Sequence, residues 1–388
     1  MQSPRPLAGL LVVAVEQAVA APFCTARLAD AGARVIKIER AEGDFARGYD
    51  DVAAGQSSYF VWLNRGKESL VVDLASPEGK ATLSDLVSRA DVLVQNLKPG
   101  ALKRLGFGAE QLRRAHPRLV QCSINGFGET GPLAERKAYD LLIQAESGLA
   151  SITGGPGEPA RVGVSLVDIA TGAAAHAAIL EALLSRAVTG NGADIRVSMF
   201  DVMAEWLTVP LLHQEAGKPP KRIGLAHPSI SPYGVFGTRE GKQILISIQS
   251  EREWAKFCSV FLEDARIASD PRFATNVQRV ANRDATDGMV AAAFARLDQA
   301  EAQERLIEAD VAFASVNDMA ALSAHPHLRR VTVGTPSGPV SYPAPAAIFM
   351  GDDREALGPV PAIGEHRPLP TRQKALPALL APSGRDSR

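Results

Sequence analysis

Residues 162–186 read VGVSLVDIATGAAAHAAILEALLSR, a stretch that predicts one long helix with an acidic residue, Asp168, at its beginning. Apolar residues recur about every three to four positions from Ile169 to Leu184 and mark one helical face. Asp168 therefore falls at or near the N-cap, where free backbone amides and the helix dipole favour an ionised carboxylate. The small residues at 170–175 leave room for a bulky group to approach that carboxylate. Asp168 can simply cap the helix, or it can serve as a nucleophile.

Strand and helix patterns alternate through the first half of the chain. Apolar strands are expected at 10–15, 34–38, 69–73, 91–95, 119–124 and 195–198, with helices at 20–31 and 77–90. This alternation predicts an α/β fold with an open, mainly parallel sheet that carries helices on both faces. Ligands on such sheets bind outside the carboxyl ends of the strands. A site is therefore expected at the turns 16–22, 39–43, 96–100 and 125–131.

The length and composition of the chain predict two lobes. The chain has 388 residues, of which 46% are hydrophobic and 22% are charged, enough to bury a large core. After Pro219-Pro220 an extended polar loop leads to the pattern of a small α/β lobe, with a strand at 243–248 and helices at 251–261, 282–297 and 299–309. We expect a large lobe over 1–215, a small lobe with linkers over 216–330, and a return to the large lobe over 331–388. Residues 368–388 are expected to form a poorly ordered tail.

The composition disfavours several classes of protein. The formal net charge of −1 gives no sign of a nucleic-acid partner or of an anionic membrane surface. The three cysteines, Cys24, Cys122 and Cys258, are widely spaced without a CxxC pair, so neither a metal site nor a disulfide framework is expected. No apolar run approaches the ~18 residues of a membrane span, and the run at 7–15 ends at Glu16 without a convincing cleavage site. We therefore expect a cytoplasmic protein whose N-terminal run is a strand.

Basic residues recur at or near the turns that follow the predicted strands. Neither a Walker motif nor a GxGxxG motif is present, so ordinary nucleotide binding has little support. Each basic side chain alone can be a solvated surface charge, but several on one rim would suit a ligand with several phosphates. The residues are Lys37, Arg40, Arg47, Arg65, Lys67, Lys98, Arg104, Arg136 and Lys137.

A series of ordered motifs runs along nearly the whole chain. It begins with AGARVIKIER at 31–40 and Gly43-Asp44, and continues with NRGK at 64–67, NLKPG at 96–100, RLG at 104–106, NGFG at 125–128, Tyr139-Asp140, Gly190-Asn191-Gly192 and Gly364-Glu365-His366. This series resembles the family III CoA-transferases, a superfamily that contains formyl-CoA transferase and alpha-methylacyl-CoA racemase. The resemblance implies a large Rossmann-like lobe, a smaller α/β lobe and an interlocked homodimer. Pairing would bury a predicted helix at 200–212, which carries Trp206, Val209 and Leu212.

The resemblance also implies roles for individual residues. Asp168 occupies the position of the catalytic aspartate. The residues implied for the CoA site are Arg40, Val72, Asn96, Ala101, Arg104, Lys137 and Asp140. Of these, Arg40 and Arg104 would meet phosphates, and Val72 and Ala101 would either contact the adenine or pack in the core. Lys137 and Asp140 would lie nearer the pantetheine or the mouth of the site. Residues that would touch the acyl group are Val19, Tyr139, His227, Ser229 and Tyr233. No tightly bound cofactor or metal is implied, because CoA and acyl-CoA are substrates.

The implied chemistry is transfer of CoA between carboxylic acids through aspartyl anhydride and aspartyl-CoA intermediates. Backbone amides near Asp168 and at Gly154-Gly155 would stabilise the oxyanions. The run at 16–22 resembles the branch that uses larger acyl groups, including short dicarboxylates such as succinate, mesaconate or itaconate, and succinyl-CoA is a candidate donor. Arg47 and Arg222 are candidates to pair with the distal carboxylate of such a substrate.

Two alternatives remain open from the sequence. One is an acyl-CoA racemase or epimerase that acts at the alpha carbon, in which a histidine precedes the aspartate that matches Asp140. This chain has Tyr139 at that position, and an ordinary tyrosine with a pKa near ~10 is a poor base at neutral pH. The other alternative is a catalytically silent CoA-binding protein, against which the presence of Asp168 argues.

Overall fold

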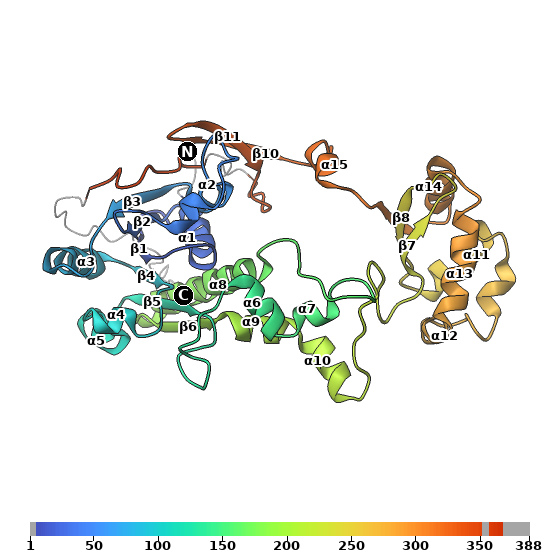
Figure 1. Ribbon diagram of the computed structural model, residues 1–388, viewed down its shortest axis with the longest axis horizontal. Helices are drawn as coiled ribbons and strands as arrows, with labels where there is room; N and C mark the ends of the chain where they lie inside the picture. Colours follow the sequence, from blue (N-terminus) through green and yellow to red (C-terminus); the bar gives the residue numbers. More distant parts are fainter. Residues whose placement is uncertain (1–4, 351–356, 368–388) are drawn as a thin grey trace, which may run out of the picture. The chain divides into compact units, whose positions relative to one another are not determined.

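The computed structural model describes residues 5–350 and 357–367, so the tail expected at 368–388 lies outside the described residues. The described chain divides into two compact units (Figure 1). The first comprises the described residues of Met1–Leu149, Val162–Val209 and Arg329–Arg388, and the second comprises Ala150–Arg161 and Pro210–Leu328. The chain therefore leaves the first unit and returns to it.

A parallel sheet forms the centre of the first unit, with its strands in the order β3-β2-β1-β4-β5-β6 (Figure 1). The strands are β1 (Leu11–Val15), β2 (Arg34–Glu39), β3 (Lys67–Val71), β4 (Val92–Gln95), β5 (Val120–Asn125) and β6 (Asp194–Ser198). The predicted α/β fold with a mainly parallel sheet is confirmed, although β3 begins before the predicted 69–73. The strand order reverses between β1 and β4, which opens a crevice at their carboxyl ends.

Helices cover both faces of this sheet, and the alternation of side chains along β1 shows why. Val12 and Ala14 pack with α1 (Ala20–Asp30) and α8 (Leu166–Thr189) on one face. Val13 and Val15 point to the opposite face. That face is covered by α3 (Pro77–Arg89) and by residues in and around α4 (Ala101–Arg104) and α5 (Ala109–Ala115). Both faces of the strands are therefore buried, as their continuous apolar runs require.

The other elements of the first unit surround the sheet. They are the 3₁₀ helix η1 (Phe45–Gly48), α2 (Ser58–Asn64), α6 (Asp140–Glu146), α7 (Leu149–Ile152, which ends in the second unit), α9 (Met199–Trp206), and the hairpin of β10 (Arg330–Thr335) and β11 (Gly338–Pro343). The single helix predicted at 200–212 is wrong, because the chain forms α9 and then α10 (Thr208–Glu215). Pro210 explains the break, since inside one continuous helix it would lack an N–H donor and clash with the preceding turn.

The second unit has a small antiparallel sheet covered by helices. Its strands, in the order β7-β8-β9, are β7 (Tyr233–Gly237), β8 (Gln243–Ser247) and β9 (Ala312–Ser315). Its helices from residue 251 on are α11 (Glu251–Val260), η2 (Ala265–Ser269), α12 (Asn276–Ala281), α13 (Arg283–Phe294), α14 (Gln299–Glu308) and α15 (Met319–Ser323). Trp254, Phe257 and Phe294 are buried in a core of their own.

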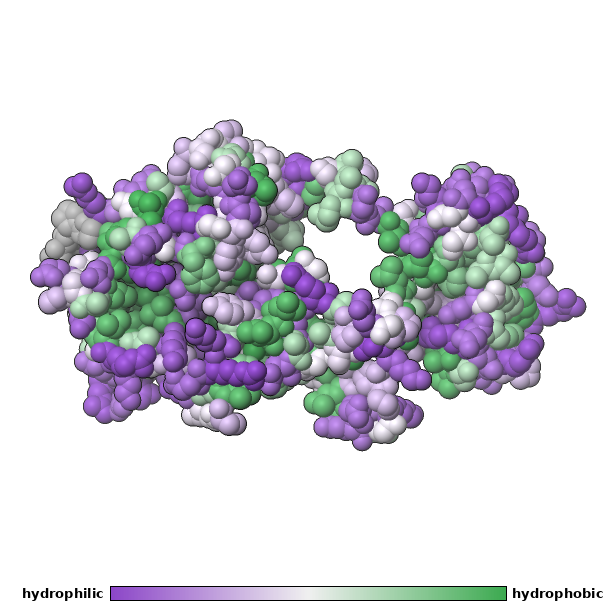
Figure 2. Space-filling model, viewed as in Figure 1, coloured by the Kyte–Doolittle hydropathy of each residue, from purple (hydrophilic) through white to green (hydrophobic). Residues whose placement is uncertain are grey.

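Helix α8 is long and apolar enough by length and composition to cross a membrane, and no other helix in the described chain is. In the structure its buried side chains face α1, the sheet and α9 instead. Figure 2 shows hydrophilic side chains over much of the visible surface of each unit, with apolar patches between them. The hydropathy of α8 is therefore explained by its position beside the central sheet, since core helices are often apolar.

Close packing of α8 on α1 depends on Gly172. A Cβ atom built at Gly172 would lie 2.4 Å from the carbonyl oxygen of Ala20 and 3.0 Å from Cβ of Phe23. Residues 170–172 and Ala175 are buried. The small side chains expected to leave room for a ligand instead let two helices approach each other.

We expect Gly172→Ala to lower the free energy of unfolding by about 1–3 kcal/mol, because the added methyl group forces the two helices apart. Urea unfolding of the full chain measures this. Gly288→Ala is the matched control, since Gly288 lies within α13 with nothing near its Cβ position. There the better helix propensity of alanine should stabilise by up to about 1 kcal/mol. Equal stabilisation by both changes would contradict the packing account.

Candidate active site

Asp168 is the third residue of α8, and Ser165 occupies the N-cap. Asp168 therefore lies near the N-cap, as predicted, but it does not occupy the cap position, so the alternative that it caps the helix is wrong. The helix begins earlier because Leu166 and Val167 continue its apolar face, and Val167 is fully buried. The side chain of Ser165 makes no capping hydrogen bond either.

Asp140, the first residue of α6, supplies the cap from a distant part of the sequence. Its Oδ1 accepts hydrogen bonds from the backbone N–H groups of Val167 at 2.7 Å and Asp168 at 3.2 Å. Its Oδ2 accepts from Nε2 of Gln144 at 2.7 Å, and Oε1 of the buried Gln144 accepts from the N–H of Val162 at 2.9 Å. Asp140 thus holds the start of α8, and the amides expected to stabilise oxyanions near Asp168 already donate to it.

The carboxylate of Asp168 has no hydrogen-bond donor among the residues that the structure describes. Burial raises the pKa of Asp168 to about 7, and the nearby Asp140 carboxylate adds to the increase. Loss of hydration and a like charge are the two features that make a carboxylate basic and reactive. Asp168 has both of these features.

Two tyrosines, Tyr49 just after η1 and Tyr59 of α2, lie near the start of α8. Burial raises the pKa of Tyr49 to about 12, with further contributions from Asp44 and Asp168. The ring of Tyr49 meets that of Tyr59 edge-on, with 5.5 Å between centroids, and Tyr59 Oη lies 3.4 Å from Oγ of Ser165. Tyr49 and Tyr59 were not predicted as site residues, because no local pattern in the sequence distinguishes them. Tyr139, which was predicted, is 57% exposed.

A cavity of about 580 Å³ opens at the carboxyl ends of the central strands of the first unit. It is lined by residues 15–17, 38–44 and 72–75 and by Leu97 and Leu105. Arg40 and Val72, two of the residues implied for CoA, are in this lining. Asn96 lies just beside it, where its Oδ1 and Nδ2 bond the N–H and the carbonyl of Gln17 at 2.9 and 2.8 Å. The size and place of the cavity are those of a small-molecule site.

The other residues implied by the sequence lie in several places. Ala101 and Arg104 are the ends of α4, where Arg104 is exposed, and Lys137 lies in an exposed loop. Val19 is buried at the N-cap of α1. The remaining three, His227, Ser229 and Tyr233, belong to the second unit, where the rings of His227 and Tyr233 stack with 5.2 Å between centroids.

A fully buried ionic network lies beneath the loop that follows β1. Oε1 of Glu16 lies 2.7 Å from Nζ of Lys67 and 3.4 Å from Nζ of Lys37, and Lys37 also bonds Oδ2 of Asp44 at 2.8 Å. Burial opposes ionisation of Glu16, but the two ammonium groups lower its pKa overall. Oδ1 of Asp44 accepts from the N–H of Ala18 at 3.1 Å, so the network fixes the loop after β1.

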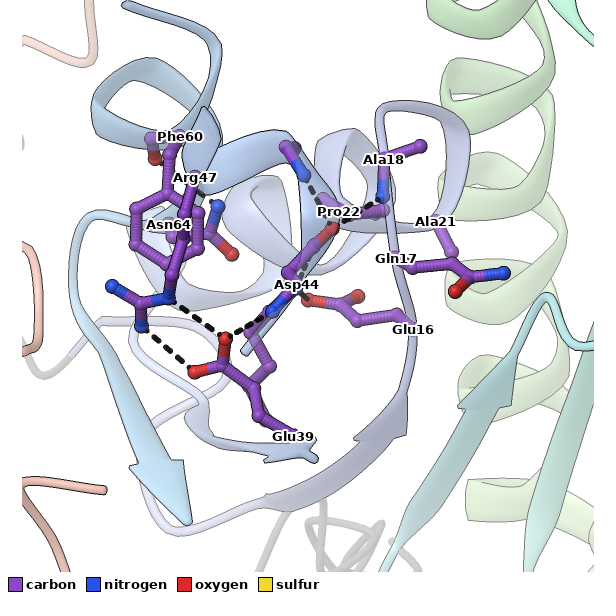
Figure 3. Close-up of polar contacts among 12 residues, drawn as sticks. Glu16, Gln17, Ala18, Ala21, Pro22, Glu39, Asp44, Arg47, Phe60 and Asn64 are labelled. Atoms are coloured by element: carbon purple, nitrogen blue, oxygen red, sulfur yellow. Dashed lines mark hydrogen bonds and ion pairs between the residues drawn. The ribbon is translucent and has the colours of Figure 1, made fainter. Parts of the chain in front are cut away.

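The two arginines expected to meet a distal carboxylate are both engaged within the fold. Arg47 makes two hydrogen bonds to Glu39, at 2.9 and 2.8 Å, and its guanidinium lies 3.7 Å from the centroid of the Phe60 ring (Figure 3). Arg222 donates to the carbonyl oxygens of Ser151 and Gly155 at 3.0 and 3.2 Å within the second unit. Lys37 and Lys67, the two selected basic residues that lie on strands, are likewise structural, because they form the buried network.

Known proteins match this chain along most of its length. Residues 7–367 match the model of CoA-transferase family III. An acetyl-CoA:oxalate CoA-transferase of Acetobacter aceti is 37% identical over 377 residues, which cover 96% of each chain. A succinate–glutarate CoA-transferase of Agrobacterium fabrum is 40% identical over 288 residues, 72% of each chain. The crystal structure of a CAIB/BAIF family protein from Brucella suis superposes with a TM-score of 0.78 and 35% identity, covering 94% of this chain and 98% of that one.

Proposed function

This chain belongs to CoA-transferase family III, and we propose that it moves CoA from an acyl-CoA thioester to a carboxylic acid with Asp168 as the nucleophile. The observation that carries the proposal is the state of Asp168. Its carboxylate is partly buried and its pKa is raised to about 7. The backbone N–H groups of Val167 and Asp168 at the start of α8 donate to Asp140. A carboxylate with a raised pKa is a better nucleophile than an ordinary aspartate, and near pH 7 about half of it is ionised.

The proposed substrates are a short acyl-CoA donor, such as succinyl-CoA, and a short dicarboxylate acceptor. Two relatives are named for oxalate and glutarate, which are both dicarboxylates. Mesaconate and itaconate are further candidates of the same chemical class. With Arg47 and Arg222 engaged elsewhere, the distal carboxylate of such a substrate needs another partner, and Lys137 is the exposed cation nearest in sequence to Tyr139.

The proposed reaction has four substitutions at carbonyl carbon and needs no net proton transfer. A carboxylate oxygen of Asp168 attacks the donor thioester, the carbon–sulfur bond breaks, and CoA leaves as a thiolate from a mixed anhydride. The thiolate attacks the Asp168 carbonyl of that anhydride and releases the donor acid, which leaves an aspartyl-CoA thioester. The acceptor carboxylate attacks this thioester, its carbon–sulfur bond breaks, and a second anhydride forms with release of the CoA thiolate. The thiolate then attacks the acceptor carbonyl, which releases the new acyl-CoA and the carboxylate of Asp168.

We place the nucleotide of CoA in the cavity at the carboxyl ends of β1–β4. There the guanidinium of Arg40, with Arg104 on the adjoining α4, would pair with phosphates. Val72 lines the same cavity and would contact the adenine with Ala101. The acyl group would lie near Asp168, among Tyr49, Tyr59 and Tyr139, whose rings suit a mainly apolar chain. CoA is a substrate in this proposal, and no tightly bound cofactor is needed.

We also propose a cytoplasmic homodimer. Trp206, Val209, Leu211 and Leu212, at α9 and α10, are each more than half exposed. Large apolar side chains that are exposed to this extent favour burial in an interface. A reducing compartment is supported by Cys24, Cys122 and Cys258, which are buried and not joined by disulfides. A molar mass in solution equal to one chain would refute the dimer.

The transfer itself is tested with a panel of acyl-CoA donors and dicarboxylate acceptors, followed by chromatography of the CoA esters. We expect new acyl-CoA only when both substrates are present. Hydroxylamine should trap an activated carboxylate on Asp168 in the presence of a productive donor, detectable by peptide mass spectrometry. Exchange of the alpha proton of an acyl-CoA into solvent, with no transfer and no adduct, would replace the proposal by racemase chemistry.

Formation of the Asp168 adduct is expected to increase with pH and to reach half its maximum near pH 7, because only the ionised carboxylate attacks. Asp140→Asn removes the like charge and should move this midpoint to lower pH. Rapid-quench measurement of adduct formation at saturating donor gives the profile. Asp201→Asn, on exposed surface of α9, is the control and should leave the midpoint unchanged. An unchanged midpoint in Asp140→Asn would contradict the electrostatic role of Asp140.

A further inference from the structure

The segment that contains the Gly364-Glu365-His366 motif folds back onto the edge of the central sheet. We call residues 359–366 the C-terminal clasp. The N–H of His366 donates to the carbonyl of Ser69 in β3 at 3.0 Å, and Nδ1 of His366 accepts from the N–H of Ser69 at 3.3 Å. The carbonyl of Pro359 accepts from the N–H of Gly66 at 2.8 Å. The side chain of Glu365 accepts from the N–H of Ala362 at 2.8 Å, which fixes the turn of the clasp.

The clasp connects to the cavity through the hydroxyl of Ser69. The N–H of Gly364 donates to Oγ of the fully buried Ser69 at 2.9 Å, and this hydroxyl donates in turn to Oε2 of Glu39. Oε1 of Glu39 accepts from the N–H of Asp44 at 2.9 Å. Burial opposes ionisation of Glu39, yet the hydrogen bonds from Arg47 help to lower its pKa to about 2, so its charge persists at neutral pH.

Residues 39–44 form one wall of the cavity, and we call them the 39–44 loop. Its two ends are Glu39 and Asp44. Hydrogen bonds connect Ser69 to Glu39 and Glu39 to Asp44, and we call this chain of hydrogen bonds the relay. The clasp also packs against the loop next to Asp44, since a Cβ atom at Gly43 would lie 2.8 Å from Cδ1 of Ile363. The carbonyl of Pro361 also lies within 3.4 Å of Nη1 of Arg47, which binds Glu39.

From these contacts we infer that the C-terminal clasp, acting through Ser69 and Glu39, positions the 39–44 loop for binding of CoA. The inference rests on the proposed function, because it assigns CoA to this cavity. The loop carries Arg40, whose guanidinium would meet a phosphate at a lower entropic cost if the backbone of the loop is already fixed. A loop held at both ends loses less conformational entropy when the ligand binds. Ser69, Glu39 and the clasp are therefore positioning groups and touch no reacting atom.

The test is calorimetric titration of free CoA into the full-length wild-type protein, Ser69→Ala, Ile363→Ala and Gln56→Ala. Ser69→Ala breaks the relay and should raise the Kd for CoA by about three- to tenfold, the range that a lost hydrogen bond permits. At saturating acyl-CoA, kcat should change by less than about twofold, because Asp168 is not affected. Gln56→Ala is the matched control, since Nε2 of Gln56 holds the β10–β11 hairpin through Thr335 and Ser337 without reaching Glu39.

Several outcomes would decide the matter. A folded Ser69→Ala protein that binds CoA as tightly as the wild type would overturn the inference. An equal loss of CoA affinity in Gln56→Ala would also overturn the inference, because the loss would then result from weaker anchoring of the chain in general and not from the broken relay. If Ser69→Ala does not fold, Ile363→Ala decides, since Ile363 is 40% exposed and its loss should raise the Kd about threefold without unfolding the chain. A wild-type protein that does not bind CoA would instead overturn the proposed function.

Discussion

Asp168→Ala is expected to lower kcat for CoA transfer by at least about 10³-fold, because no covalent intermediate can form without the attacking carboxylate. Asp168→Asn should be similarly inactive, since an amide oxygen is a poor nucleophile. The Kd for free CoA should remain within about threefold of the wild type, because the cavity at the ends of β1–β4 does not include Asp168. Steady-state kinetics and titration with CoA measure the two effects.

Asp201→Ala is the matched control for this prediction. Asp201 is the third residue of α9, as Asp168 is of α8, but it lies on exposed surface. Its replacement should leave kcat unchanged, which separates the loss of a nucleophile from the loss of a negative charge near a helix N-terminus. Transfer at a rate near that of the wild type in Asp168→Ala would refute the covalent mechanism, whatever the control shows.

Glu16→Ala is expected to destabilise the folded chain by about 3–5 kcal/mol, because it removes the carboxylate shared by two buried ammonium groups. Lys37 keeps Asp44 as a partner, but Lys67 keeps only neutral oxygens, from Pro22 and Asn64. Burial already lowers the pKa of Lys67 to about 8 with Glu16 present. Without that carboxylate its pKa should fall further, so that Lys67 loses its proton near neutral pH.

Urea unfolding at constant pH measures the loss, and Glu68→Ala provides the comparison. Glu68 pairs with Arg34 between the neighbouring strands β3 and β2 at 2.7 Å, but the two side chains are 25% and 37% exposed. Such a pair contributes only about 0–1 kcal/mol. If Glu16→Ala were no more destabilising than Glu68→Ala, the ionic network would not be a determinant of stability.

Much of the fold follows from local patterns in the sequence. The β-strands of the central sheet are short apolar runs, and the α/β alternation predicts their parallel arrangement. The family was identified from motifs that stand in order along the chain, and the family model matches residues 7–367. The prediction of one helix at 200–212 was wrong because it followed the spacing of the apolar residues and neglected Pro210, although that residue is visible in the sequence.

The candidate site was predicted in part. Asp168 was selected from its place beside a helix start, and its role as nucleophile stays a prediction. The interpretation of the small residues at 170–175 was wrong for the buried positions 170–172 and 175, because the sequence cannot show that Ala20 and Phe23 of α1 lie opposite Gly172. Asp140 was selected for CoA, but both its oxygens are engaged at the start of α8 and at Gln144.

The sequence by itself determined the α/β class, the elements of the central sheet and the aspartate at the start of α8, because each depends on residues close together in the chain. Only the tertiary structure decided what surrounds that aspartate. Asp140 caps α8 across 28 positions of sequence, and the clasp reaches Ser69 across 295. Such contacts depend on how layers pack and on where buried polar groups find partners, and neither leaves a periodic signal in the chain. The raised pKa of Asp168 is likewise a property of burial and of the neighbouring charge, which arise only on folding.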